Sequence, residues 1–213
     1  LHKKLKKEFF KIFGIKLLEN YGLSETTFVS LEKPNSKNTY KTGFVGSIVN
    51  NVNVGLKDIN RGTHKEIHVN SKYIFDGYID LNNENNLISY DKFFNTKDVG
   101  FIKKEKKEKL LFLSGRSKEI IKKRGYYLNL NLIEEFFEKH PLVIEAKAVS
   151  HNDNSGLEDY KLFLKLKNNN NLNLKKVNEW SYKSINPNYL PEKIILIRKF
   201  PKNTSGKIKI FNL

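Results

Sequence analysis

The apolar positions at the start of the chain follow helical spacing. In residues 2–13, Leu5, Phe9 and Phe13 recur four residues apart, which places them on one face of a helix. Gly14 follows directly, and glycine commonly ends a helix because it adopts the left-handed backbone at low cost. We therefore expect an amphipathic helix over residues 2–13.

Shorter apolar runs, alternating with polar residues or broken by glycine, dominate the chain up to Arg116 and predict strands. The expected elements are a buried strand at Ile15–Leu18, a turn at Asn20–Gly22, a strand pair within Gly43–Leu56, a strand at Glu66–Asn70, and a hairpin over Val99–Arg116 with a charged tip at Lys103–Lys109. Asp80–Asn86 is rich in asparagine and is expected to be a surface turn.

From Ser117 onward, helical and strand patterns are interspersed. The expected elements are a strand and turn within Glu119–Leu128, a helix at 130–139, a strand pair at Ile144–Ser150 and Tyr160–Lys167, a loop at 168–173, a helix at Leu174–Ile185 and a strand at Lys193–Phe200. The change of pattern places a boundary near Arg116–Lys118. The chain is therefore predicted to be α+β, with a β-rich first part and a compact second part.

The composition narrows the class of protein. Of the 213 residues 38% are hydrophobic, enough to bury a core, and no apolar run approaches the ~18 residues that a membrane span needs. No secretory signal peptide opens the chain, and the absence of cysteine excludes disulfides and thiolate metal sites. These features fit a cytoplasmic protein. Because the chain lacks methionine and begins at Leu1, we expect it to be a piece of a longer protein.

The chain is strongly basic, with 39 lysine and arginine residues against 23 aspartate and glutamate residues and a net charge of +16. One interpretation is a polyanionic partner, such as nucleic acid, an anionic membrane surface or a phosphorylated substrate. The other is a biased composition, since lysine and asparagine are plentiful throughout and mix with apolar positions as on solvated faces. We favour a biased composition as the explanation of the positive charge, because no aromatic and basic module of the RNA-binding kind stands out.

A series of motifs gives the chain a more specific signature. In order they are NYGLSET (20–26), GFVGSI (43–48), EIHVNSKYIFDGY (66–78), NTKDVGFI (95–102), LFLSGRSKEIIKKRGYYL (111–128), IEEFFEKHPLVIEAKAV (133–149) and PKNTSGKIK (201–209). Their order and spacing resemble the C-terminal half of AMP-forming adenylating enzymes, which include acyl-CoA synthetases, non-ribosomal peptide adenylation domains and firefly-type luciferases. The resemblance implies that residues 1–117 are the C-terminal portion of a large AMP-binding N-terminal domain and that 118–213 are a small, mobile α+β lid domain.

The resemblance also implies a reaction. An enzyme of this kind uses ATP and Mg²⁺ to convert a carboxylic acid into an acyl-adenylate and pyrophosphate, and then transfers the acyl group to the thiol of CoA or of a phosphopantetheinyl carrier. Attack of a carboxylate on the α-phosphate brings two anions together, so a metal ion and a cationic side chain must neutralise the developing charge. An acyl-CoA synthetase-like ligase is favoured here. A ligase that loads an acyl or aminoacyl group onto a carrier protein is the alternative.

The first motif would contribute to nucleotide binding. By resemblance, Asn20, Tyr21, Gly22 and Ser24 lie beside the nucleotide, and Tyr21 stacks on the adenine. Ser24 stands where the family usually has threonine and keeps the hydroxyl that contacts the α-phosphate. Glu25 would hold Mg²⁺, so that Ser24 and Glu25 act in catalysis. Read alone, the motif is a turn with a core tyrosine and a solvated glutamate.

Two further residues would bind the ribose. Asp98, in Thr96-Lys97-Asp98, matches the aspartate of a Thr-Gly-Asp motif that accepts hydrogen bonds from both ribose hydroxyls, and Arg116 matches an arginine that also reaches the ribose. Lys97 replaces the glycine of that motif, which leaves open whether the local turn is kept. The alternatives are a turn-capping aspartate and a surface arginine paired with a nearby acid.

The remaining candidates follow the boundary. Lys118 stands at the family's hinge, where the small domain swings between the adenylation and thioester-forming orientations. Lys122 and Gly125 match a loop that faces the site in the thioester step, and the alternative for Lys122 and Lys123 is a basic strand edge that blocks unwanted pairing. Lys207, after Ser-Gly, would bridge the substrate carboxylate and phosphate oxygens and is the principal catalytic candidate.

The family's phosphate-binding loop, a Ser/Thr/Gly-rich segment that ends in Pro-Lys, has no counterpart in the sequence. We therefore expect the missing N-terminal part of the same enzyme to be a partner of this chain, and we expect no pyrophosphate release from the chain alone. From another functional class, a degenerate pseudoenzyme or a basic nucleic-acid-binding module is the alternative. Retention of Glu25, Asp98, Arg116 and Lys207 argues against decay.

Overall fold

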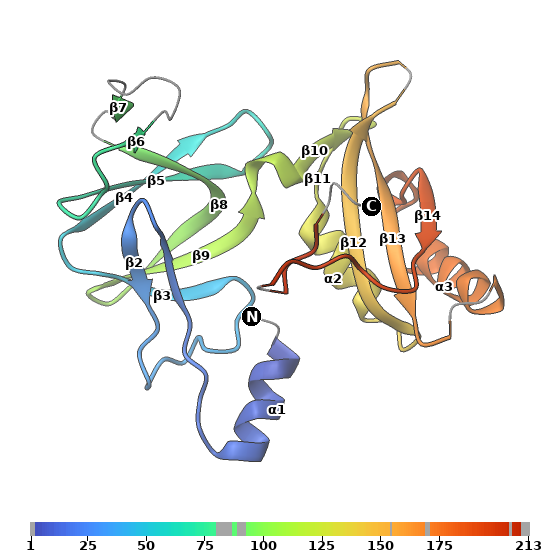
Figure 1. The fold of residues 1–213 in the computed structure, drawn as a ribbon, viewed down its shortest axis with the longest axis horizontal. Helices are drawn as coiled ribbons and strands as arrows, with labels where there is room; N and C mark the ends of the chain where they lie inside the picture. The colour runs from blue at the N-terminus through green and yellow to red at the C-terminus, as the bar shows by residue number, and fades with distance from the viewer. Residues whose placement is uncertain are drawn as a thin grey trace. The chain divides into compact units, whose positions relative to one another are not determined.

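The computed structural model describes residues 3–79, 87–88, 93–153, 155–168, 171–204 and 206–209 (Figure 1). The chain forms two compact units, unit 1 over Leu1–Ser117 and unit 2 over Lys118–Leu213. A large antiparallel sheet dominates unit 1, whereas helices and strands are mixed in unit 2. The predicted α+β class is therefore confirmed. The turn predicted at Asp80–Asn86 lies outside the described residues.

Seven of the described strands of unit 1 form one sheet. They are β1 (Asn20–Leu23), β2 (Thr27–Leu31), β3 (Phe44–Ile48), β4 (Val52–Asp58), β5 (Lys65–Ser71), β8 (Phe94–Glu105) and β9 (Glu108–Arg116). They lie in the order β1-β2-β3-β9-β8-β5-β4, and neighbouring strands are antiparallel. β8 and β9 form the predicted hairpin, while the short β6 (Tyr78–Ile79) and β7 (Leu87–Ile88) pair separately.

The prediction of a strand pair within Gly43–Leu56 is wrong. The two strands exist as β3 and β4, but β3 lies between β2 and β9, whereas β4 pairs with β5. Alternation of apolar and polar residues shows that one face of a strand is buried and does not show which strand lies beside it. Contacts far along the sequence select the partner, and a local pattern does not contain them.

The strand predicted at Ile15–Leu18 is also wrong. These residues are not paired, and the side chains of Ile15 and Leu18 are 64% and 40% exposed. Pairing begins at Asn20, so the turn that was expected at Asn20–Gly22 lies instead at residues 24–26, between β1 and β2. A four-residue apolar run needs a neighbouring strand to become a buried strand, and these residues have none.

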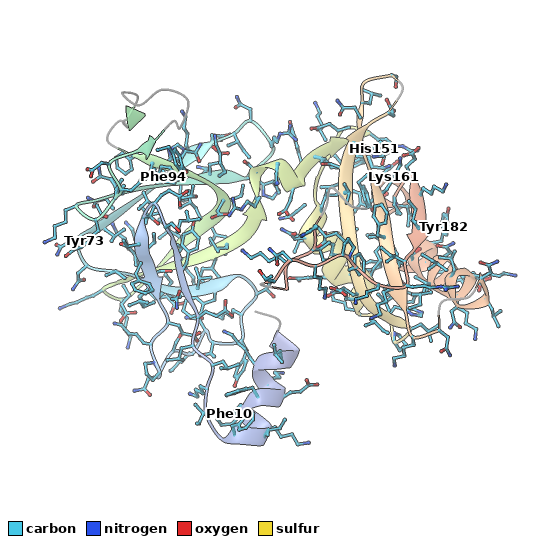
Figure 2. The ribbon with its side chains drawn as sticks, viewed as in Figure 1. Phe10, Tyr73, Phe94, His151, Lys161 and Tyr182 are labelled. Carbon is cyan, nitrogen blue, oxygen red and sulfur yellow. The ribbon has the colours of Figure 1, made fainter. Side chains whose placement is uncertain are left out.

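The core of unit 1 includes a cluster formed by Tyr21, Val29, Val45, Val52, Ile67, Val69 and Leu111, and a smaller cluster formed by Phe44, Leu110 and Phe112. The helix predicted near the start of the chain is confirmed as α1 (Lys3–Phe13), and it ends at Gly14, whose φ is +68°. Several apolar side chains of α1 are exposed, including Phe10 (Figure 2). The amphipathic pattern therefore predicted the helix, but its apolar side is only partly covered.

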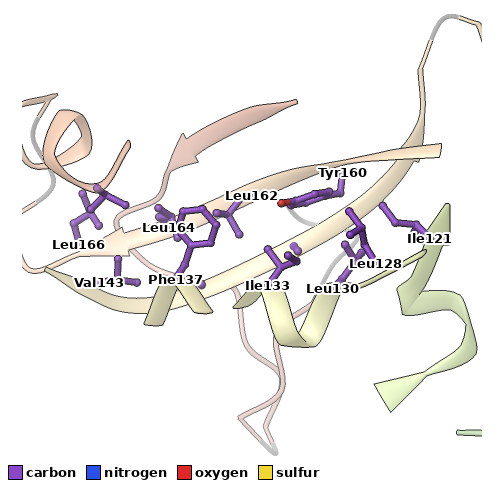
Figure 3. Packing of buried hydrophobic residues seen from close by; sticks show 13 residues of the cluster. Ile121, Leu128, Leu130, Ile133, Phe137, Val143, Tyr160, Leu162, Leu164 and Leu166 are labelled. Carbon is purple, nitrogen blue, oxygen red and sulfur yellow. The ribbon is translucent and has the colours of Figure 1, made fainter. Parts of the chain in front are cut away.

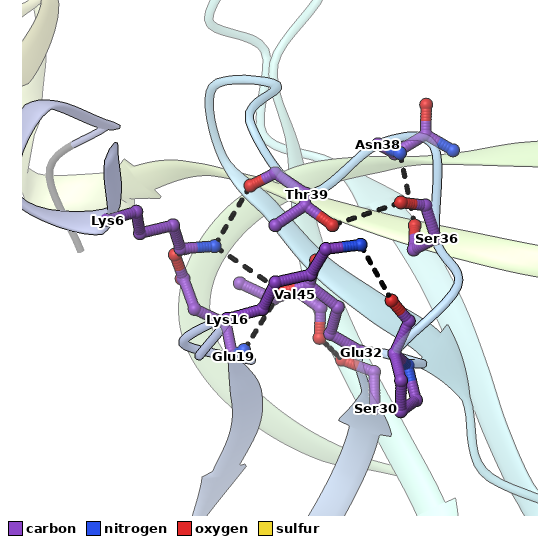
Figure 4. Close-up of polar contacts among 10 residues, drawn as sticks. Lys6, Lys16, Glu19, Ser30, Glu32, Ser36, Asn38, Thr39 and Val45 are labelled. Carbon is purple, nitrogen blue, oxygen red and sulfur yellow. Dashed lines mark hydrogen bonds and ion pairs between the residues drawn. The ribbon is translucent and has the colours of Figure 1, made fainter. Parts of the chain in front are cut away.

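A buried ion cluster attaches α1 to the sheet (Figure 4). The Lys6 ammonium lies 2.7 Å from a Glu19 carboxylate oxygen and 3.3 Å from Glu32 Oε2, and it donates to the Thr39 carbonyl at 3.0 Å. The Glu19 backbone N–H also donates to Glu32 at 3.0 Å. The side chain of Lys6 is only 3% exposed and that of Glu32 is fully covered, so these charges compensate one another without water.

Unit 2 mixes helical and strand elements. In order they are η1 (Ser117–Glu119), β10 (Ile120–Lys123), β11 (Tyr126–Asn129), α2 (Leu130–Glu138), β12 (Val143–Asn152), β13 (Glu158–Leu166), α3 (Asn171–Ser184), η2 (Pro187–Tyr189) and β14 (Lys193–Leu196). β10 and β11 form a hairpin, β12 and β13 pair antiparallel, and β14 joins β13 in parallel. α3 begins three residues before the predicted helix, so part of the asparagine-rich tract is helical.

The core of unit 2 forms between α2 and the sheet (Figure 3). Ile133 and Phe137, one helical turn apart, are buried in one cluster with Leu162 and Leu164 of β13. The Asn129 side chain caps the start of α2 by accepting a hydrogen bond from the Asn131 N–H at 3.0 Å. In the described part of the chain, no helix has both the length and the apolar character needed to cross a bilayer.

Candidate functional site

The hairpin of β1 and β2 presents Ser24 and Glu25 at its turn. Thr26 closes this turn: its hydroxyl accepts a hydrogen bond from the Leu23 N–H, and its own N–H donates to the Leu23 carbonyl, both at 3.1 Å. Gly22 is required beside it, because a Cβ atom there would lie 2.0 Å from a carbonyl oxygen of β2. A larger residue at this position would push the two strands apart.

A second turn positions Asp98 in β8. The Thr96 hydroxyl donates to the Ile67 carbonyl at 2.8 Å and accepts from the Asp98 N–H at 3.1 Å. The Asn95 side chain accepts from the Lys97 N–H at 2.8 Å, and Lys97 has φ +59°, in the left-handed region. The backbone therefore keeps the conformation that a glycine would adopt, and lysine occupies it at the cost of some strain.

Asp98 connects β1 with the β8–β9 hairpin. Its Oδ2 accepts a 2.7 Å hydrogen bond from the Tyr21 hydroxyl, and its Oδ1 lies 2.9 Å from Arg116 Nε. Burial raises the pKa of Tyr21, and the charge of Asp98 raises it further, so the phenol remains a donor. Asp98 is 7% exposed, whereas the Arg116 side chain is 47% exposed, so part of the guanidinium faces solvent.

Glu25 is held at the β1–β2 turn from two sides. Its Oε1 accepts a 2.6 Å hydrogen bond from the Tyr78 hydroxyl, and its backbone carbonyl accepts from the Phe75 N–H at 3.0 Å. Glu25 is half-buried, while Ser24 and Asn20 are exposed. The structure therefore fixes the carboxylate and leaves the neighbouring hydroxyl accessible.

The β10–β11 hairpin contains two of the predicted residues of unit 2, Lys122 in β10 and Gly125 in the turn. Gly125 has φ +84° and follows Arg124 at φ +48°, and two successive left-handed residues make the tight reversal of the hairpin. Lys122 is exposed, with its ammonium 5.8 Å from the centre of the Tyr127 ring. The backbone N–H of Lys122 donates to the Glu158 carboxylate at 2.7 Å, which connects this hairpin to β13.

Lys207 lies on a preformed turn near the end of the described chain. The Asn203 side chain accepts from the Lys207 N–H at 2.8 Å, and the Asn203 N–H donates back to the Lys207 carbonyl at 2.9 Å. Gly206 adopts φ +79° within this turn, and Lys202 pairs with Ile208 across it. The backbone of Lys207 is thus fixed, and its side chain is exposed.

Unit 2 also has a shallow polar depression that contains none of the predicted residues. Its lining includes His151, Lys161 and Glu192, and the first two lie near each other in Figure 2. His151 Nε2 lies 2.5 Å from a Glu192 carboxylate oxygen. We find no arrangement there that matches the chemistry of the motifs.

Comparison with known proteins shows which family and which enzymes the chain is similar to. Residues 132–207 match the family described as the AMP-binding enzyme C-terminal domain. The chain is 27% identical over 208 residues to 4-coumarate–CoA ligase CCL1 of Humulus lupulus, covering 93% of this chain and 37% of that protein. It is 24% identical over 201 residues to the mitochondrial medium-chain acyl-CoA ligase ACSF2 of Mus musculus, covering 91% of this chain and 32% of that protein. The match to the family model covers about a third of the chain, and nearly the whole chain is similar to adenylate-forming acyl-CoA ligases.

Solved structures give the same result for the fold. ATP-bound MatB from Rhodopseudomonas palustris matches with a TM-score of 0.80 at 21% identity, covering 98% of this chain and 42% of that one. The chain spans about a third of the length of the curated relatives it matches. It corresponds to the C-terminal part of such adenylating enzymes.

Unit 1 brings three of the predicted residues into direct contact: Tyr21, Asp98 and Arg116. Glu25 and Ser24 lie on the hairpin that contains Tyr21. The other candidates belong to unit 2: Lys122 and Gly125 share the β10–β11 hairpin, whereas Lys118 lies in η1 and Lys207 on the turn near the end of the described chain.

Some residues of the site were not predicted. Tyr78 holds Glu25, and Thr96 holds the turn before Asp98, although both stand inside quoted motifs. Lys123 was considered only as part of a basic strand edge, yet it is 2% exposed and paired with Asp159. The alternation of a strand could have predicted the burial of Lys123. Lys123 stands two residues after the buried Ile121 in β10, so both side chains lie on the same face of the strand.

Proposed function

We propose that this chain, together with the rest of its protein, is an AMP-forming acid–thiol ligase. It would activate a carboxylic acid with ATP as the acyl-adenylate and then transfer the acyl group to the thiol of CoA. The Tyr21–Asp98–Arg116 cluster carries the proposal, because β1 and the β8–β9 hairpin, which are far apart in sequence, hold a carboxylate between a phenol and a guanidinium. The similarity to a 4-coumarate–CoA ligase and to a medium-chain acyl-CoA ligase supports CoA over a carrier protein as acceptor.

Asp98 and Arg116 would bind the ribose of the nucleotide. A carboxylate offers about four acceptor positions on two oxygens, so it can accept from a vicinal diol as well as from its protein donors. Tyr21 and Arg116 fix the carboxylate plane before the ligand arrives, which lowers the entropy cost of binding. Stacking of Tyr21 on adenine stays a prediction. Because Tyr21 is only 7% exposed, its geometry supports another role, which is to orient Asp98.

Ser24 and Glu25 would serve the phosphates. Mg²⁺ is usually held by one or two carboxylates plus substrate phosphate oxygens. A single oriented carboxylate fits that pattern. When bound, the ion would neutralise the charge on the phosphates. The exposed Ser24 hydroxyl would donate to the α-phosphate.

Unit 2 would supply the mobile charges. Lys207 would place its ammonium between the substrate carboxylate and the α-phosphate, with a flexible stem on a fixed backbone turn. Lys118 would be the pivot that moves unit 2 between the two half-reactions, and the turn with Lys122 and Gly125 would be used in thioester formation.

A chimera tests the proposal. Residues 1–213 replace the corresponding C-terminal part of a 4-coumarate–CoA ligase, and acid-dependent exchange of pyrophosphate into ATP is measured. We expect exchange in the chimera, none from the chain alone, and a loss of about 10²-fold in the Asp98→Ala chimera. Asp58→Asn, which alters a carboxylate on the edge strand β4, is the matched control. A folded chimera without exchange, or one that tolerates Asp98→Ala, contradicts the proposal.

A further inference from the structure

The segment around Lys118 is held on both sides by side chains that are not among the candidate site residues of the sequence analysis. β9 ends at Arg116, η1 covers Ser117–Glu119, and β10 begins at Ile120. Lys118 itself is exposed, so it lies between two anchored neighbours.

On the unit 1 side, Glu66 holds Ser117. Burial acts to raise the pKa of Glu66, but hydrogen bonds from the Ser117 hydroxyl and the Asn95 amide lower it overall, so the carboxylate remains charged. The Asn95 amide donates to Glu66 Oε2 at 2.7 Å. Arg116, the preceding residue, is bound to Asp98 and paired with it across the hairpin. The chain is therefore fixed to unit 1 up to Ser117.

On the unit 2 side, Glu119 is held by α2 and β12. Its Oε2 accepts a 2.7 Å hydrogen bond from the Asn131 side chain, and its Oε1 lies 3.8 Å from the Lys147 ammonium. Lys147 in turn lies 2.7 Å from Glu134, which joins α2 to β12. Ile120, the next residue, has no exposed surface. The chain is therefore fixed to unit 2 from Glu119 onward.

We propose that Glu66 and Glu119 are positioning residues that confine reorientation of unit 2 to the backbone of Lys118. This inference rests on the proposed ligase function, because that function requires two orientations of unit 2. Confinement makes the reorientation reproducible: a rotation about one residue leads to defined end positions, whereas a loose linker of four or five residues leads to many.

Hydrogen exchange of the full chain tests the two anchors. Asn131→Ala removes the donor to Glu119, and we expect the amides of Glu119 and Ile120 to exchange about tenfold faster, since a hydrogen bond to a charged group is lost. Glu66→Ala removes the acceptor of the Ser117 hydroxyl and should accelerate exchange of the Ser117 amide in the same way. Glu135→Ala, an exposed site on α2, is the matched control and should change none of them. If Asn131→Ala unfolds α2, Glu119→Ala is used in its place.

Spin-label distances test the pivot. The chain has no cysteine, so Asn53→Cys on β4 and Lys176→Cys on α3 give one label on each unit. Asn131→Ala should broaden the distance distribution, whereas Lys118→Pro, which fixes φ, should narrow it. If the Glu119 and Ile120 amides exchange at the wild-type rate in Asn131→Ala, or if Glu135→Ala accelerates them equally, the proposed anchoring role is wrong. An unchanged distribution in Lys118→Pro overturns the pivot. No ATP or acid is present, so these outcomes are independent of the chimera assay.

Discussion

Tyr21 and Asp98 are 77 residues apart in the sequence, and the Tyr21 hydroxyl donates a 2.7 Å hydrogen bond to the Asp98 carboxylate. This bond fixes a charged group that is almost covered by protein. Charged groups in such places need donors, because the lost hydration has to be replaced. The bond therefore links the stability of unit 1 to the geometry of its candidate nucleotide site.

Tyr21→Phe should lower the free energy of unfolding by about 1–3 kcal/mol, because it removes a donor from a buried carboxylate and leaves the ring in place. Urea unfolding followed by far-UV circular dichroism measures this change. Tyr73→Phe, at a residue that is 53% exposed, should leave stability unchanged. Equal effects of the two substitutions would show that the Asp98 bond contributes nothing specific.

The same phenol predicts a dependence of stability on alkaline pH. Burial and then Asp98 raise the pKa of Tyr21 above its ordinary value of 10.0. Its stabilising contribution is therefore complete below pH ~10 and is lost as the pH rises toward the folded-state pKa, by up to about 1.4 kcal/mol per pH unit. Above pH ~10, the fall in the free energy of unfolding per pH unit should be smaller in Tyr21→Phe than in the wild type. It should also be smaller in Tyr160→Phe, because burial and the charge of Asp159 raise the pKa of Tyr160. Tyr73→Phe should keep the wild-type slope.

Lys97→Gly should raise the free energy of unfolding by about 1 kcal/mol, since glycine relieves the left-handed strain at φ +59°. Lys104→Gly, at an exposed position of the same strand, should have the opposite sign, because glycine weakens a regular strand. Thermal or urea unfolding distinguishes the two. A destabilised Lys97→Gly protein would mean that the lysine side chain makes a contact that outweighs the strain.

Lys6→Met should destabilise unit 1 by about 3–5 kcal/mol, because Glu19 and Glu32 would then lie together without their cation. Glu32 Oε1 is buried and makes no hydrogen bond within the described part of the chain, which makes the loss of Lys6 more costly. Lys11→Met, at an exposed position of α1, is the control. Similar unfolding midpoints for the two variants would rule out this role of the buried cluster.

The sequence predicted those parts of the fold that depend on local spacing. α1, α2 and the β8–β9 hairpin follow from periodicity and turn residues, which neighbouring residues determine. The pairing of β3 with β9 and the exposure of Ile15 depend on contacts far along the chain, and no local pattern contains them.

The candidate site shows the same division. The resemblance of the sequence motifs to those of the family singled out Tyr21, Asp98 and Arg116, which the structure brings together. It gave no sign that Tyr78 holds Glu25, because that contact joins residues 53 positions apart. The left-handed backbone of Lys97 was also beyond a sequence argument, because side-chain chemistry does not determine φ.

Lys207 and Lys209 allow a matched test within one turn. Both lysines are exposed and two residues apart, but only the Lys207 N–H is bound by the Asn203 side chain. In the chimera, Lys207→Ala should lower pyrophosphate exchange by about 10²–10³-fold, because a cation aimed at the reacting phosphate is lost. Lys209→Ala should stay within about twofold, since solvated surface charges contribute little. Asn203→Ala should fall between them, because the ammonium remains while its backbone is less restrained. If Lys209→Ala lowers exchange as much as Lys207→Ala, general positive charge and not one positioned ammonium explains the activity.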